Sequence, residues 1–143
     1  MARFRQDTKV LALKRSPLFE GLANKQLATL ARLTDDLEVP AGTVLCREGK
    51  SGREFFVIID GEAEVTRGGK HVATIGSGEF FGEIALLERV VRTATVTAKT
   101  PLRFFVLTSQ AFWGLLDHQP EIQREVLRAL ARRVASESSD PTA

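Results

Sequence analysis

Glycine is concentrated in the middle of this 143-residue chain, and this concentration constrains the fold more than any other feature. Nine of the 11 glycines lie between Gly42 and Gly82. Short runs rich in β-branched and aromatic residues stand between them, and this alternation is typical of strands joined by tight turns. The runs are TVLCR, EFFVIID, EAEVTR and KHVATIG, and TATVTA and LRFFVL follow. We predict about seven or eight short strands, arranged as a sandwich or jelly-roll barrel.

The segments on either side of the strands have helical periodicity. Before them, leucines recur at mostly helical spacing after Asn24, which we expect to be an N-cap. After them, Ser109 can cap a short helix, and Pro120 suits the first turn of a longer one. The long helix is amphipathic and carries a stripe of arginines typical of a solvated face. These arginines are Arg124, Arg128 and Arg132. The predicted fold class is mainly β with flanking α-helices: a double-stranded β-helix (jelly-roll) barrel with an N-terminal helix and a C-terminal helix pair.

Composition limits the function classes. The hydrophobic fraction is 43% and the charged fraction 27%, as in ordinary globular domains. No apolar run approaches the roughly 18 residues that a membrane span needs, and the N-terminus lacks a signal-peptide core. The single Cys46 cannot form an internal disulfide. We therefore expect one cytoplasmic domain without a membrane partner, and the net charge of +2 gives no indication of nucleic-acid binding.

The segment FFGEIALLERVVRTATV, from Phe80 to Val96, has the outline of a pocket for an anion and a sugar. Gly82 lets the backbone approach a ligand closely. About one turn of helix follows Glu83, and its first amides would direct positive partial charge at a phosphate. Arg92 adds a fixed fork of donors that suits phosphate oxygens. An ion pair of Arg92 with Glu83 or Glu88 is the alternative, and Glu83 can also interact with the helix dipole.

The same segment resembles the phosphate-binding cassette of cyclic nucleotide-binding domains. FGEIALL is followed by an arginine ten residues after its glycine and then by TATV, as in that family. SPLFEGL opening a helix, PAGTVLCREG, FFVIIDGEAEV and the closing helix pair also resemble the family's landmarks, in the family's order. The resemblance implies a helical or flexible lead at 1–15, a cyclic nucleotide-binding domain at 16–136 and a disordered tail at 137–143.

The resemblance also implies roles for individual residues. Glu83 would accept a hydrogen bond from the ribose 2′-hydroxyl, and backbone amides of the cassette would hold the phosphate and sugar. Arg92 would pair with the phosphate charge, and Thr93 would add an amide and a hydroxyl. The implied ligand-binding residues are Phe81, Gly82, Glu83, Ile84, Ala85, Arg92 and Thr93. Leu127 and Leu130 of the last helix either cap the base or pack in the core, and the sequence does not separate these alternatives.

The cassette departs from the family pattern at Arg89, Val90 and Val91, where relatives commonly have a nearby glycine and a proline before the arginine. Two adjacent valines prefer extended backbone and burial. We therefore expect a different path for the exit loop, packed on the closing helices or on a partner.

The function that this resemblance implies is that of a regulatory domain. It would bind a cyclic nucleotide, cAMP before cGMP, and signal by moving Gln119 to Val134, with Leu86 and Leu87 as coupling contacts. No cofactor and no catalytic residue is expected. His71 and His118 are too few for the metal site of a cupin-type enzyme. We expect no direct DNA binding, a protein partner or a fused effector domain, and a possible homodimer. A degenerate domain that only binds a protein is the remaining alternative.

Overall fold

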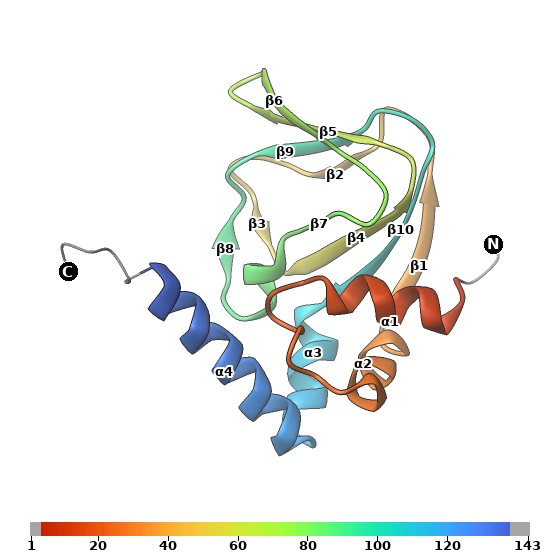
Figure 1. Cartoon of the computed structure of the whole chain (residues 1–143). Helices are drawn as coiled ribbons and strands as arrows, with labels where there is room; N and C mark the ends of the chain where they lie inside the picture. Colours follow the sequence, from red (N-terminus) through yellow and green to blue (C-terminus); the bar gives the residue numbers. More distant parts are fainter. Residues whose placement is uncertain (1–3, 138–143) are drawn as a thin grey trace.

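A computed structural model describes residues 4–137, in which two β-sheets face each other and helices cover one of them (Figure 1). The strands within these residues are β1 (Asp35–Val39), β2 (Val44–Cys46), β3 (Ser51–Gly52), β4 (Glu54–Asp60), β5 (Ala63–Arg67), β6 (Lys70–Ile75), β7 (Phe80–Phe81), β8 (Val90–Val91), β9 (Thr95–Ala98) and β10 (Leu102–Thr108). One sheet has the order β1-β10-β4-β7, and the other has the order β2-β9-β5-β6. All the pairs are antiparallel, and β3 and β8 form a separate ribbon.

The two central strands of the first sheet, β4 and β10, are buried on both of their faces. In β4, Phe55 and Val57 pack into the core shared with the helices, whereas Phe56 and Ile58 pack between the two sheets. A strand covered on both faces needs apolar side chains at successive positions. This double burial explains why EFFVIID and LRFFVL are nearly continuous apolar runs rather than alternating ones.

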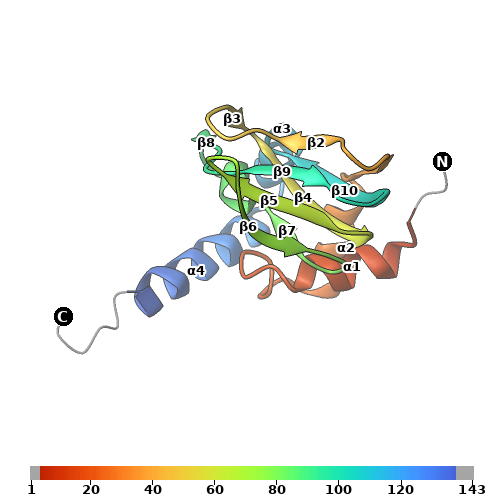
Figure 2. The ribbon, with the colours of Figure 1, turned by 90° about the horizontal axis from the view of Figure 1, so that it is seen from above.

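Three helices lie beneath the first sheet, and a fourth extends away from it. The helices are α1 (Gln6–Lys14), α2 (Asn24–Ala31), α3 (Ser109–Leu116) and α4 (Pro120–Glu137). The first half of α4 packs against the core through the buried side chains of Ile122 and Val126. Its second half projects beyond the sheets (Figures 1 and 2). No helix within residues 4–137 is long and apolar enough to cross a membrane.

The N-terminal helix is anchored to the sheet through charged groups. Lys9 and Asp36 form an ion pair at 2.5 Å in which both side chains are almost fully buried. The backbone N–H of Phe4 donates to the same carboxylate at 2.7 Å. Helix α1 occupies most of the expected lead at 1–15, and residues 138–143 of the expected tail lie outside the described residues.

Two of the predicted helix caps are wrong by one residue. Ala23 has the extended backbone of a cap, and its N–H donates to the Gln26 side chain at 2.9 Å, so Asn24 is already helical. Thr108 caps α3, because this last residue of β10 remains extended and its hydroxyl accepts from the third residue beyond it at 3.1 Å. Ser109, the predicted cap, is the first helical residue.

Four strands and one turn region also differ from the sequence-based expectation. Strands β3, β7 and β8 have two residues each, which is too short for a periodic signal. Strand β1 is acidic and largely exposed, so it lacks the apolar alternation that reveals a strand. The segment SPLFEGL forms turns between α1 and α2 and does not open a helix.

Candidate functional site

The segment from Phe80 to Val96 borders a cavity of about 550 Å³. Strand β7, the 3₁₀ helix η1 (Glu83–Leu86), strand β8 and the start of β9 form one wall of this cavity. All seven residues expected to bind a ligand line it, namely Phe81, Gly82, Glu83, Ile84, Ala85, Arg92 and Thr93. The spacing of the cassette therefore identified one continuous surface.

Gly82 connects β7 to η1 in a conformation that favours glycine. Its φ is +85°, and a Cβ at this position would lie 2.6 Å from both the Glu54 carbonyl oxygen and Nη1 of Arg92. The Ala85 N–H donates to the Gly82 carbonyl at 3.1 Å, which closes the first turn of η1. The absence of a side chain at Gly82 thus brings the cassette backbone directly against the Arg92 guanidinium.

Arg92 is a buried cation, and no carboxylate within residues 4–137 forms an ion pair with it. Its Nη2 donates to the Glu54 carbonyl at 2.8 Å, and its guanidinium lies 5.8 Å from the centre of the Phe56 ring. Its Nε is buried without a hydrogen-bond partner. The alternative ion pairs with Glu83 or Glu88 are not formed. A buried charge is costly unless it is paired, so this arrangement suits an anionic ligand.

The segment that departs from the family pattern helps to hold the Arg92 backbone in place. Val90 and Val91 form β8, which pairs with Gly52 and Ser51 of β3. The Arg92 N–H donates to the Lys50 carbonyl at 2.8 Å, and the Arg92 carbonyl accepts from Gly49 at 2.9 Å. The exit from η1 is thus a short antiparallel ribbon. Val91 is 61% exposed, so it is not buried against the closing helices, and its packing on a partner stays a prediction.

Gly52 makes room for the Arg92 side chain, a role that could not be predicted from the sequence. A Cβ at Gly52 would lie 1.9 Å from Nε of Arg92, so the absence of that atom is required for the guanidinium to occupy its place. The sequence indicates only a turn in EGKSG, because the contact joins residues 40 positions apart whose strands are too short to recognise.

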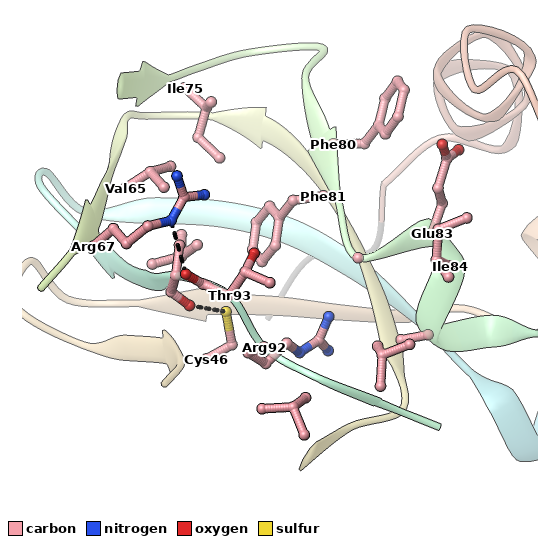
Figure 3. A pocket seen from close by; sticks show the side chains of 16 residues that line it. Cys46, Val65, Arg67, Ile75, Phe80, Phe81, Glu83, Ile84, Arg92 and Thr93 are labelled. Carbon is pink, nitrogen blue, oxygen red and sulfur yellow. Dashed lines mark hydrogen bonds between the residues drawn. The ribbon is translucent and has the colours of Figure 1, made fainter. Parts of the chain in front are cut away.

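Glu83 is the second charged group of the cassette, and both of its carboxylate oxygens are engaged. Oε2 accepts from the Ser16 hydroxyl at 2.8 Å, and Oε1 forms an ion pair with Arg133 of α4 at 2.5 Å. Ser16 is fully buried in the turn between α1 and α2. Figure 3 shows the carboxylate turned away from Arg92. Glu83 therefore connects the cassette to both helical ends of the chain.

The other end of the cavity is largely apolar. Val65 of β5 and Ile75 of β6 line it, whereas Cys46 of β2 lines the cavity beside Arg92 (Figure 3). Burial raises the pKa of the Cys46 thiol, against a smaller opposing effect of Arg92. Arg67, at the end of β5, also lines this region, and its Nε donates to the Thr93 carbonyl at 3.0 Å (Figure 3). The cavity thus has a polar end at Arg92 and an apolar end bordered by one arginine.

The last helix does not reach the cavity. Neither Leu127 nor Leu130 lines it: Leu127 is 65% exposed, whereas Leu130 packs against the helical core. The structure therefore brings the cassette residues together but not the expected base lid.

The cassette helix is also bonded to α3. The Leu86 carbonyl accepts from the Trp113 Nε1–H at 2.8 Å and from the Ser109 hydroxyl at 3.2 Å. Leu86 itself is fully buried, and Leu87 packs against the same core. Trp113 itself is 44% exposed.

The histidines are far from any metal-site geometry. His71 lies 3.6 Å from a carboxylate oxygen of Glu64 at the surface, and Nδ1 of His118 lies 2.9 Å from the Gly114 carbonyl oxygen. Within residues 4–137, no cluster of three histidine, cysteine, aspartate or glutamate side chains could hold a metal ion.

Comparison with known proteins supports the geometry. The family model described as "cyclic nucleotide-binding domain" matches residues 36–119. The cAMP-dependent protein kinase regulatory subunit of Schizosaccharomyces pombe is 36% identical over 118 residues, which are 82% of this chain and 29% of that protein. A cyclic nucleotide-gated potassium channel of Rhizobium etli is 37% identical over 118 residues, with coverages of 82% and 33%. The chain thus spans about a third of the length of these curated relatives.

Solved structures agree. The N-terminal domain of a transcriptional regulator from Streptomyces coelicolor superposes with a TM-score of 0.82 at 30% identity, covering 89% of this chain and 92% of that one. The regulatory domain of Toxoplasma gondii PKA, crystallised with cAMP, gives 0.69 at 30% identity, with coverages of 76% and 43%. The predicted mainly β jelly-roll fold with flanking helices is confirmed. With its cassette, its barrel and this family match, the chain belongs to the cyclic nucleotide-binding domain family.

Proposed function

We propose that this domain binds cAMP through the cassette and reports its binding through α4. The main support for this proposal is the state of Arg92. It is a buried cation that lines the cavity and has no carboxylate partner in the described part of the chain. A cyclic phosphate would supply the missing negative charge, beside the backbone at Gly82. The ligand then needs no metal or further cofactor, and cGMP is the alternative nucleotide.

The sugar would be recognised by Glu83, which must change partners to do so. Ser16 and Arg133 occupy its two oxygens, and a ribose 2′-hydroxyl would compete for them. A ligand shifts a conformational equilibrium only by its different affinity for the two states. Loss of the Arg133 contact on binding would provide that difference and release the second half of α4. Leu127 and Leu130 could then reach the base.

The output would pass to another domain or protein. The curated relatives are a kinase regulatory subunit and a potassium channel, and this chain corresponds to about a third of each. We therefore propose a fused effector, a separate protein partner or a second copy as the recipient of the signal. The cytoplasmic location and the absence of direct DNA binding remain predictions.

Calorimetric titration with cAMP and with cGMP tests the binding proposal, on the wild-type chain and on Arg92→Ala. We expect heat with the wild type and a strongly weakened response with the variant. Absence of heat with either nucleotide would favour a degenerate domain that only binds a protein. Hydrogen exchange across 119–134 tests the signal, because unchanged protection on binding would rule out release of α4.

A further inference from the structure

The cavity has two chemically different ends, and they orient any nucleotide within it. Arg92 and Gly82 form the end suited to a phosphate. Val65 and Ile75 form the opposite, apolar end, where Figure 3 shows the Arg67 side chain beside Val65 and Thr93. A cyclic nucleotide whose phosphate contacts Arg92 therefore directs its base toward Arg67.

Arg67 is held at one nitrogen and free to donate from the others. Its Nε–H donates to the Thr93 carbonyl at 3.0 Å, and this bond fixes the plane of the guanidinium. No carboxylate in residues 4–137 forms an ion pair with it, and no hydrogen bond of its terminal nitrogens is found there. Four N–H donors at the base end of the cavity are thus available to a ligand.

Purines differ in what they offer to such a set of donors. Guanine presents two adjacent acceptors, O6 and N7, which pair with both prongs of an arginine. Adenine presents N7 as an acceptor but a donating amino group at position 6, which an arginine cannot satisfy. We infer that Arg67 reads the base and raises the affinity of this pocket for cyclic nucleotides of 6-oxopurines relative to cAMP. This inference rests on the proposed function. Arg67 would make the pocket less selective against cGMP than a pocket without this arginine.

The test measures dissociation constants for cAMP, cGMP and the 3′,5′-cyclic phosphate of inosine, which has O6 and N7 but no 2-amino group. We expect Arg67→Ala to weaken the binding of cGMP and of the inosine nucleotide by about fivefold or more. Fivefold is the lower end of the effect of a bidentate contact, and we expect this lower end because Arg67 is exposed. Binding of cAMP should change less than about twofold, since adenine engages at most one prong. Lys70→Ala is the matched control, because it removes one positive charge from the same hairpin without lining the cavity.

Each other outcome has a distinct meaning. If Arg67→Ala weakened the binding of all three nucleotides equally, the effect would be general electrostatics, and recognition of the base by Arg67 would be overturned. Weakening of cGMP alone, with the inosine nucleotide behaving like cAMP, would assign the discrimination to the 2-amino group and also overturn it. Failure of the wild-type chain to bind any of the three would refute the proposed function itself. Thermal unfolding of each variant verifies that the compared proteins are folded.

Discussion

Replacement of Arg92 by alanine is the most informative perturbation of this domain. Arg92 is only 8% exposed, so its charge already carries its desolvation cost in the folded chain. Loss of one partner of a desolvated charge pair typically costs about 2–5 kcal/mol. At about 1.4 kcal/mol per tenfold change, this range corresponds to a weakening of roughly 30-fold to 4,000-fold. We expect the upper half of the range, because a phosphate at this site gains the attraction without having to strip water from the arginine.

Titration calorimetry measures the loss directly, and ligand-induced thermal stabilisation provides a second readout. A saturating ligand at about 100 times its dissociation constant adds about 2.7 kcal/mol to the free energy of unfolding. That gain should be present in the wild type and nearly absent in Arg92→Ala. Arg92→Lys should fall between the two, because it keeps the charge but loses the fork of donors. Binding by a folded Arg92→Ala within about threefold of the wild type would refute the assignment of the phosphate to this residue.

Two further variants test how the charged groups of the cassette are held. Gly52→Ala should weaken nucleotide binding at least about tenfold, because its Cβ would lie 1.9 Å from Nε of Arg92 and displace the guanidinium. Gly114→Ala, where no atom lies within 4 Å of the new Cβ, is the matched control, and equal affinities of the two would contradict the steric argument. Arg133→Ala should tighten binding by up to about fivefold, the effect of removing a half-exposed competitor worth at most about 1 kcal/mol. Arg128→Ala, which breaks a pair within α4, should leave the affinity unchanged, and weaker binding by Arg133→Ala would mean that Arg133 orients the carboxylate for the sugar.

The sequence predicts the barrel and the cassette because both depend on local chemistry. Glycines mark the turns, apolar runs mark the buried strands, and one 17-residue segment supplies the cavity wall. Gly82 is recognisable from the sequence because glycine is the residue that readily adopts the positive φ found before η1. The fold class and the common surface of the seven cassette residues could therefore be predicted from the sequence.

The contacts that hold the cassette could not be predicted, because they join residues far apart in the sequence. Ser16 and Arg133 reach Glu83 across 67 and 50 residues, and Gly52 faces Arg92 across a two-residue ribbon. None of these positions has a periodic or compositional signal. The direction of α4 could not be predicted for the same reason. Its amphipathic pattern shows that one face is buried but does not show which element covers that face. Leu127 is therefore equally compatible with a lid and with the surface.

The two charged groups of the site are prepared for a ligand in different ways, and this difference separates affinity from signalling. Arg92 is held by the Glu54 carbonyl, by the ribbon and by two glycines, and none of the hydrogen bonds found for it within residues 4–137 joins it to a helix. Glu83 is bonded to the α1–α2 turn and to α4, so no ligand can use it without disturbing a helical segment. Phosphate capture should therefore set the binding strength, and recognition of the sugar should set the helical response. A ligand with a cyclic phosphate but no 2′-hydroxyl would then bind without releasing α4, and that separation follows from the partners of the two side chains alone.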